Sequence, residues 1–318
     1  MKNKKWIFRF IGLIILAYIL YITDFHKYYL QLQNLDITAF LWACFLILIV
    51  YILKSLRWKL LLNGQQIRYS FYNALLAFTS SNFIAFITPG RLGEFAKIFY
   101  LKNDRNVPFS KSLPNVITDR LFDVYVLLFF GFFGIIRTGI KANWLLYMLV
   151  AISVVIPFLF FNRRIFAFWI YAITKLPLIT RFLAKRSASL KIVEQEFQKL
   201  ININLFYALI ISGIAYVLLY YISLVLTRSI GLQVDFIDII LIISVANILS
   251  FLPITISGLG TREAVIVYFF HRLSYSTEQA LLFSTLFFIC FYIVGGLYGY
   301  LCFMIKPVSI RKIQKEIE

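Results

Sequence analysis

The chain is organised as a series of long apolar runs separated by short polar stretches. A helix that crosses a bilayer needs about 20 mostly apolar residues. Because hydrocarbon offers no hydrogen-bond partners, the backbone of such a run must be helical. The runs predict an all-α, polytopic membrane protein with one integral membrane domain over residues 1–318. Its eight expected membrane helices lie at 6–22, 38–56, 71–87, 116–136, 143–161, 203–227, 236–252 and 279–305.

Composition agrees with this class. Of 318 residues, 61% are hydrophobic and 14% are charged, and the mean hydropathy is +0.84. The net charge of +18 is typical of nucleic-acid binders as well, but the basic residues form short clusters between the apolar runs. Membrane topology requires basic residues at those positions. We therefore expect no specific binding of nucleic acid.

Cysteine and histidine indicate no metal centre. Cys44, Cys290 and Cys302 lie in apolar runs without CxxC spacing or a companion histidine, so neither a disulfide framework nor a zinc site is expected. No nucleotide-binding or hydrolase motif is present in the sequence. We expect no cofactor. The run 6–22 follows a basic N-terminus but lacks a small-residue cleavage site, so we interpret it as a retained helix.

Residues 162–202 form the longest polar stretch, and their second half has the pattern of an amphipathic helix. Such a helix would lie in the headgroup region against anionic lipid. The alternative is a helix that packs on other loops of the same protein. Its apolar positions are Leu183, Leu190, Val193, Phe197 and Leu200, and its basic ones are Lys185, Arg186, Lys191 and Lys199.

Two apolar segments are interrupted in the same way, at 81–94 and at 246–263. Each has an Asn four residues before a Phe, then a Pro, a Gly-containing turn, and an Arg and a Glu. Pro removes a backbone donor and Gly tolerates positive φ, so the chain can stop and reverse there. We predict two re-entrant hairpins, 71–101 and 236–271, in which Asn82 and Asn247 satisfy freed backbone groups. The turn residues are Pro89, Gly90, Gly93, Pro253, Gly258 and Gly260.

The distribution of basic residues supports the reversals. With both hairpins closed, 24 of the 32 Lys and Arg residues fall on one side, five fall on the other, and Arg91, Arg120 and Arg262 remain within the membrane. Positive residues favour the cytoplasmic side, so we expect cytoplasmic N- and C-termini in a bacterial-type inner membrane. The units 38–136 and 203–305 then enter from opposite sides, which predicts an inverted repeat with its site near the midplane.

Charged side chains gather at the first break. Charges at membrane depth cost several kcal/mol, about 2.5 to 3.5 on insertion scales, and need a partner or a function. Glu94, Glu263, Asp119 and Asp123 form a candidate charge network. The arginines suit phosphate, which their forked donors grip in pairs; alternatively, the charges are ion pairs that hold the hairpins. The candidate phosphate-binding residues are Arg91, Arg262, Arg120, Lys97, Thr88, Thr261 and Ser257; turn chemistry explains the hydroxyls equally well.

Three motifs carry a family resemblance. The segment from Thr88 to Glu94 with Lys97, the Asp119-Arg120-x-x-Asp123 sequence, and the segment 257–263 resemble the flippase-like transmembrane region of lysylphosphatidylglycerol synthases. The resemblance covers essentially the whole chain. It implies transfer between leaflets of a lipid with a phosphate-containing headgroup, such as an aminoacylated phosphatidylglycerol. The chain ends at Glu318, so we expect it to lack the soluble lysyl-transfer domain and not to be an enzyme.

Other functions fit the same residues. A transporter of polyprenyl-phosphate-linked lipids could use the same arginines. A membrane-embedded transferase could use Glu94, Asp119 and Asp123 as acid and base groups. A scaffold for a lipid-modifying enzyme partner is a third possibility. The expected partners in all cases are membrane lipids with anionic headgroups.

Overall fold

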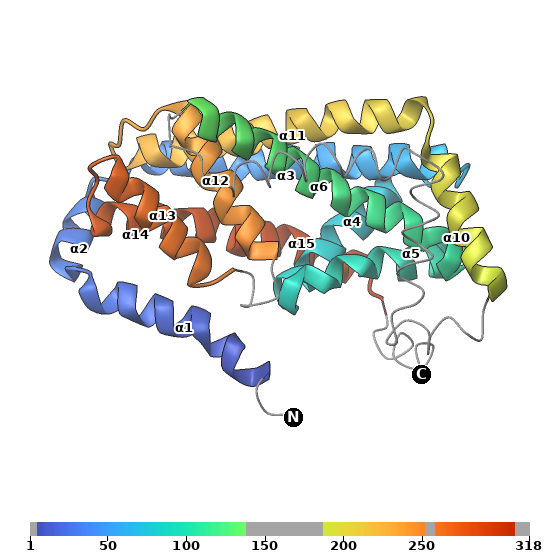
Figure 1. The fold of residues 1–318 in the computed structure, drawn as a ribbon, viewed down its shortest axis with the longest axis horizontal. Coiled ribbons are helices and arrows are strands. Elements are labelled where there is room, and N and C mark those ends of the chain that lie inside the picture. The colour runs from blue at the N-terminus through green and yellow to red at the C-terminus, as the bar shows by residue number, and fades with distance from the viewer. Residues whose placement is uncertain (1–4, 138–186, 252–257, 309–318) are drawn as a thin grey trace.

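The computed structural model describes residues 5–137, 187–251 and 258–308, and the described part is entirely helical (Figure 1). The predicted helix 143–161, the first half of the stretch 162–202, Pro253 and Ser257 lie outside the described residues. The other seven predicted spans coincide with helices of the structure. Its elements are α1 (Lys5–Ile22), α2 (Phe25–Gln33), α3 (Ile37–Gly64), α4 (Phe71–Phe86), η1 (Pro89–Ala96), α5 (Lys97–Arg105), α6 (Phe109–Arg137), α10 (Ser187–Leu200), α11 (Ile203–Ser229), α12 (Phe236–Phe251), α13 (Thr261–Arg272), α14 (Thr277–Phe288), η2 (Ile289–Val294) and α15 (Gly295–Ile305).

Local sequence explains where several helices begin. Asp36 caps α3 by accepting hydrogen bonds from the backbone N–H groups of Thr38 and Ala39, and Ser70 caps α4 in the same way through Asn73. Ser276 forms a capping box with Gln279 at the start of α14. These side chains satisfy donors that the first turn of a helix leaves open. The polar residues between apolar runs therefore set the helix boundaries.

The helices α3 and α11 form a long antiparallel pair. The backbone N–H of Asp36 donates to Ser229 O at 2.8 Å at one end, and Asn202 Nδ2 donates to Gly64 O at 3.2 Å at the other. The two helices run side by side along the length of the molecule (Figure 1). Their first residues therefore lie at opposite ends of the bundle.

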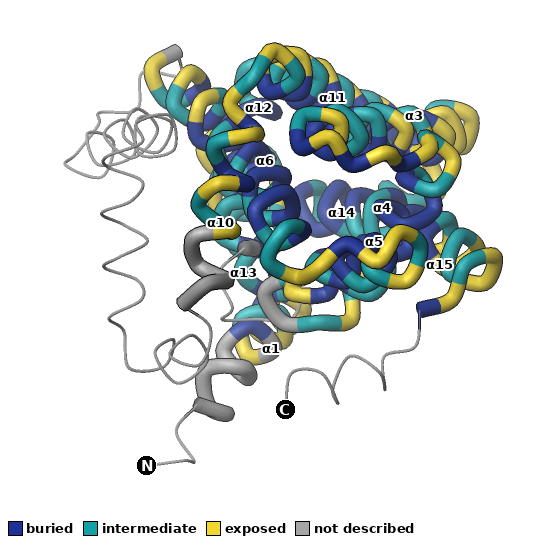
Figure 2. The backbone as a smooth tube through the Cα atoms, turned by 90° about the vertical axis from the view of Figure 1, so that its right-hand side faces the viewer, coloured by how far each residue is buried: buried dark blue, intermediate teal, exposed yellow. Residues whose placement is uncertain are grey.

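Within the described residues, three helical segments are long and apolar enough to cross a membrane: Ile37–Gly64, Ile203–Ser229 and Thr277–Ile305. Their outward positions carry exposed apolar side chains, among them Phe45, Ile214 and Leu301. Figure 2 shows exposed positions on the outer faces of α3, α11 and α15 and buried ones inside the bundle. An apolar exterior of this kind is what lipid requires. The protein is a multi-pass membrane protein.

Each half of the chain packs one of its helices against a helix of the other half. The segment α4 of the first half packs on α15 of the second, while α12 of the second half packs on α6 of the first. Each half thus contributes one long helix that covers the broken helix of the other half. The pairing is reciprocal, and α3 of the first half packs along α11 of the second.

Basic residues are unequally divided between the two ends of the bundle. The end where α10 joins α11 carries Arg68, Lys102, Arg105, Lys111, Lys199 and Lys306. The opposite end, where α2 meets the start of α14, carries Lys27, Arg228 and Arg272 among the described residues. The end with more Lys and Arg is the one that the sequence predicts to be cytoplasmic.

The helix α10 is the described half of the predicted amphipathic segment. It packs on α6 through a cluster that includes Phe197 and Leu200, and Gln65 Nε2 donates to Glu196 Oε2 at 3.2 Å. Ile192 and Gln195 remain exposed. Phe197 and Leu200 are therefore covered by the protein, and the part of the segment before residue 187 lies outside the described residues.

Candidate functional site

The first interruption is a tight turn followed by a short 3-10 helix. Thr88 Oγ1 accepts from the backbone N–H of Gly93 at 2.7 Å and donates to Ile84 O at 3.1 Å. A Cβ on Gly93 would lie 2.4 Å from the backbone N of Ala85, so the turn folds directly onto the end of α4. Only glycine allows this approach. Pro89 stands at the first position of η1.

The chain then returns along α4. Lys97 Nζ lies 4.7 Å from the ring centre of Phe78. Further along, Lys306 Nζ contacts both Asn73, near the start of α4, and Asp104, near the end of α5. The segment 89–105 therefore runs back toward the end of the bundle from which α4 began.

The second interruption uses glycines at its turn. Gly258 and Gly260 have φ values of +78° and +84°, in the left-handed region that glycine adopts without strain. Thr261 Oγ1 donates to Gly258 O at 3.1 Å, and Glu263 Oε2 accepts from the backbone N–H of Gly260 at 2.6 Å. Both predicted hydroxyls, on Thr88 and Thr261, thus hydrogen-bond within their own turns.

A buried arginine lies at the centre of the charged cluster. Arg57 Nε donates to Asp119 Oδ1 at 2.8 Å, and Arg57 Nη1 donates to Asp123 Oδ1 at 2.7 Å. Asp119 and Asp123 share one face of α6, as their four-residue spacing predicted. Arg57 is fully buried. It therefore joins α3 to α6 inside the bundle.

Four further basic residues complete the cluster. Lys97 pairs with Asp119, and Lys54 Nζ lies 3.1 Å from Asp123 Oδ1. Arg120 pairs with Glu94 and lies 3.0 Å from Asp123 Oδ2, while Arg91 Nε lies 3.5 Å from Glu94 Oε1. Among the described residues, the cluster has five basic groups and three carboxylates: Lys54, Arg57, Arg91, Lys97 and Arg120, with Glu94, Asp119 and Asp123. Two positive charges are in excess.

The accessible charge of this cluster is positive. The side chains of Lys54, Arg120 and Arg91 are 15%, 18% and 22% exposed, whereas the three carboxylates are at most 2% exposed. The carboxylates lie behind the cations. A ligand that reaches the cluster therefore meets ammonium and guanidinium groups, which favour an anion.

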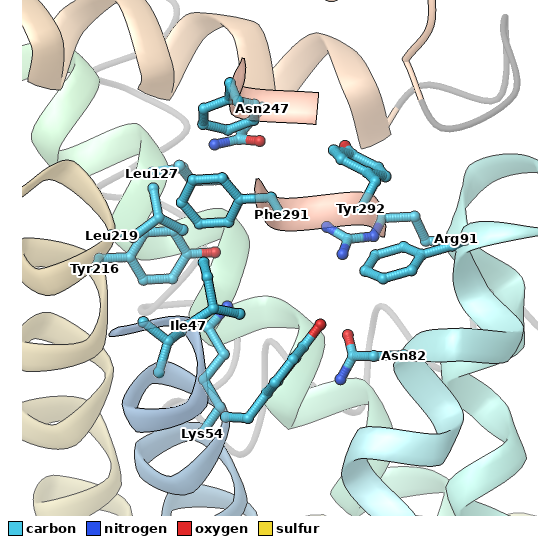
Figure 3. A pocket seen from close by; sticks show the side chains of 14 residues that line it. Ile47, Lys54, Asn82, Arg91, Leu127, Tyr216, Leu219, Asn247, Phe291 and Tyr292 are labelled. Atoms are coloured by element: carbon cyan, nitrogen blue, oxygen red, sulfur yellow. The ribbon is translucent and has the colours of Figure 1, made fainter. Parts of the chain in front are cut away.

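A pocket lies beside these cations (Figure 3). It is lined by Ile47, Val50, Tyr51, Lys54, Asn82, Phe86, Arg91, Leu127, Tyr216, Leu219, Asn247, Phe287, Phe291 and Tyr292. Tyr51 and Tyr216 stand near the midpoints of α3 and α11. Since these two helices are long enough to span a bilayer, the pocket lies about halfway through the span.

Both predicted asparagines line this pocket, from opposite sides (Figure 3). Asn82 Nδ2 donates to Phe78 O at 3.1 Å, within α4 and not at the turn. The backbone groups at that break are satisfied by Thr88 instead. The equivalent positions of the two interrupted segments therefore meet at one pocket.

The two predicted arginines have different environments. Arg262 is 1% exposed and pairs with Glu263, whose Oε1 also accepts from Ser284 Oγ at 3.3 Å. Its guanidinium carbon lies 4.9 Å from the ring centre of Tyr292 and 5.5 Å from that of Phe287. Arg91 lines the pocket and Arg262 does not. Equivalent sequence positions thus give one accessible and one buried cation.

Lys54 and Arg57 were not predicted to lie within the membrane, and Lys97 lies deeper in the bundle than the sequence predicted. All three were counted with cytoplasmic stretches, but α3 continues to Gly64 and Lys97 is 1% exposed. The set of basic residues inside the bundle is therefore larger than Arg91, Arg120 and Arg262. A usable signal existed: Lys54 and Arg57 are three apart, as are Arg120 and Asp123, so each pair shares one helical face.

The carboxylates of the cluster are engaged by cations. In the part of the chain that the structure describes, no group of three or more His, Cys, Asp or Glu side chains is arranged to hold a metal ion. Cys44 and Cys290 are buried and free. Of the accessible cations, Lys54 and Arg91 line the pocket, and they favour an anion there.

The sequence matches the lysylphosphatidylglycerol synthase transmembrane region over residues 9–299. The chain belongs to this family. The match includes both interrupted segments and the charged cluster, and the family's description links it to membrane lipids. No solved structure matches the chain significantly.

Two relatives of this family member are archaeal membrane proteins. The UPF0104 membrane protein of Methanocaldococcus jannaschii is 23% identical over 291 residues, which is 85% of this chain and 85% of the relative. That of Pyrococcus horikoshii is 24% identical over 289 residues, 82% of this chain and 85% of the relative. The similarity thus extends over most of the length of each protein.

Proposed function

We propose that this protein is a lipid transporter that moves a lipid with a phosphate-containing headgroup between the two leaflets of a cell membrane. The observation that carries the proposal is the charge asymmetry of the cluster: Lys54, Arg91 and Arg120 are accessible, and their carboxylate partners are not. Two excess positive charges inside an apolar bundle are costly unless an anion neutralises them. A lipid phosphate is an anion available in a membrane.

The arrangement of the two halves supports transport over catalysis. The antiparallel pair α3 and α11, the reciprocal packing of α4 on α15 and α12 on α6, and the pocket between the halves fit an inverted repeat. In transporters of this type, two repeats surround a site near the midplane and open it alternately to either side. We place the α10 end, which carries more basic residues, in the cytoplasm.

In this proposal the two turns are the segments that change position during transport. Both interrupted helices end at the pocket, through Asn82 and Asn247. Displacement of one turn would open the pocket toward one leaflet while the other turn keeps it closed. Arg91, at the first turn, would hold the phosphate during this exchange. Arg262 would instead fix the second turn to α14 through Glu263 and Ser284.

The test is a leaflet-exchange assay. The purified protein would be reconstituted into liposomes with a fluorescent anionic phospholipid, and a membrane-impermeant reductant would bleach the outer leaflet. The parent should allow more than half of the label to be bleached, while protein-free liposomes should retain about half. Bleaching no faster than in protein-free liposomes would contradict the proposal.

A binding measurement separates lipid from free phosphate. The anionic lipid should raise the melting temperature of the detergent-solubilised protein, and this rise should shrink when Lys54→Met removes an accessible cation. Inorganic phosphate at the same concentration should have a smaller effect, because it does not bury acyl chains. An equal rise with inorganic phosphate would indicate an anion site without lipid transport.

A further inference from the structure

The residues that line the pocket restrict which lipid headgroups it can bind. Among the described residues that line it, Lys54 and Arg91 carry charge and no carboxylate does. An ammonium group on a headgroup would therefore meet like charges in a site of low dielectric, where repulsion is stronger than in water. A headgroup amine has no anionic partner within this pocket.

Aromatic faces are the usual alternative partners for a ligand ammonium, but the protein's own cations lie over four of the six rings that line the pocket. Lys54 Nζ lies 4.5 Å from the ring centre of Tyr216, and the guanidinium carbon of Arg91 lies 5.6 Å from that of Phe86. Arg262 lies over Tyr292 and Phe287. Of the two other rings of the pocket, Phe291 packs on Phe287 with 4.3 Å between their centres, and Tyr51 carries a hydroxyl.

The uncharged polar groups of the pocket suit hydroxyls. The Tyr51 and Tyr216 hydroxyls and the Asn247 amide belong to residues that line the pocket. A hydroxyl both donates and accepts, so it can pair with a phenol or with either end of an amide. Tyr216 lies beside Lys54, whereas Asn247 lies across the pocket from it (Figure 3).

We infer that the transported lipid is a phosphodiester whose headgroup carries hydroxyls and no ammonium, and that the pocket discriminates against amine-bearing headgroups. This inference rests on the proposed transport function and specifies its substrate class. The phosphate lies against Lys54 and Arg91, and the headgroup hydroxyls pair with Tyr216 and Asn247. An aminoacylated lipid is excluded by the ammonium that it carries.

The experiment compares three lipids with identical acyl chains in the leaflet-exchange assay with the full chain. Phosphatidylglycerol has the hydroxyls and no amine, phosphatidylpropanol has the same charge without hydroxyls, and phosphatidylethanolamine has an ammonium. We expect phosphatidylglycerol to exchange about three to ten times faster than phosphatidylpropanol, the factor expected for one or two hydrogen bonds. Phosphatidylethanolamine should be slowest.

Single substitutions in the pocket test which side chains recognise the headgroup hydroxyls. Asn247→Ala or Tyr216→Phe should remove most of the difference in rate between phosphatidylglycerol and phosphatidylpropanol, because the lost group pairs only with the headgroup hydroxyls. A control is Tyr221→Phe, an exposed tyrosine on the same helix as Tyr216, which should change neither rate. Melting temperatures measured in parallel would identify a variant that acts by unfolding.

The outcomes distinguish this inference from the proposed function. If none of the three lipids exchanges faster than in protein-free liposomes, the transport function itself is wrong. If the lipids exchange but phosphatidylethanolamine is as fast as phosphatidylglycerol, transport stands and the headgroup inference is overturned. Equal rates for phosphatidylglycerol and phosphatidylpropanol would overturn the roles of Tyr216 and Asn247.

Discussion

The guanidinium of Arg57 and the carboxylate of Asp119 form a fully buried ion pair, with 2.8 Å between Nε and Oδ1, although 62 residues separate them in the chain. The pair fixes α3 to α6 and lies behind the accessible cations Lys54, Arg91 and Arg120. The cluster thus has an inner, fully paired part that holds the fold. Its outer, accessible part is available to a ligand.

The inner part should determine stability. Replacement of Arg57 by Met leaves Asp119 and Asp123 buried without their main partner, and the loss of one partner of a buried ion pair costs about 3 to 5 kcal/mol. The free energy of unfolding, measured by urea denaturation in detergent, should fall by that amount or the variant should fail to express.

Two further variants serve as controls for this result. Lys59→Met, at a partly exposed position of the same helix, should have little effect. The double variant R57M, D123N removes Arg57 and one of its two carboxylates and should recover part of the loss, since Asp119 keeps Lys97 as a partner. If R57M is as stable as the parent, Arg57 does not hold α3 to α6.

The first turn should not tolerate a methyl group. In Gly93→Ala the added Cβ would lie 2.4 Å from the backbone N of Ala85, so η1 must move away from α4. Such overpacking costs about 1 to 3 kcal/mol, and the melting temperature and lipid exchange should both decrease.

Gly213→Ala is the matched control. A Cβ on Gly213 meets nothing within 4 Å, and Ala is favoured over Gly within a helix by about 1 kcal/mol. This variant should be at least as stable as the parent. A Gly93→Ala variant of unchanged melting temperature would show that the turn is not packed against α4 in solution.

Topology can be tested at the two ends of the bundle. In a background without Cys44, Cys290 and Cys302, single cysteines at the exposed positions Gln195 and Ser274 should label from opposite sides of the membrane. We expect Gln195 to be cytoplasmic because its end carries more Lys and Arg. Labelling of both from the same side would refute the proposed arrangement of the two halves.

Helix positions could be predicted from the sequence because the apolar runs are long and membrane helices have no alternative backbone structure. The ends were less predictable. The helix α3 was expected to stop at residue 56, since Lys54, Arg57 and Lys59 look like the flank of a membrane segment, but it continues to Gly64. The short helix α2 was missed, although Asp24 provides an N-cap for it.

The charged cluster was predicted only where its members are close in sequence. The pairs of Arg120 with Asp123 and of Arg91 with Glu94 follow from helical spacing. The contacts of Arg57 with Asp119 and of Lys54 with Asp123 join different helices, and spacing contains no information about them. The different exposures of Arg91 and Arg262 likewise depend on which helix covers each turn.

In the proposed mechanism an accessible cation, Arg91, binds the lipid phosphate at the first turn, while its sequence counterpart at the second turn, Arg262, holds the fold. The direct measurement compares Arg91→Gln with Arg262→Gln for leaflet exchange of phosphatidylglycerol and for melting temperature. Arg91→Gln should lose most exchange with little change in melting temperature, and Arg91→Lys should recover part of it, because lysine keeps the charge without the paired donors. Arg262→Gln should lower the melting temperature, since Glu263 is left buried without its cation. A stable Arg91→Gln variant that exchanges lipid at the parent rate would contradict the role of Arg91 in binding the lipid phosphate.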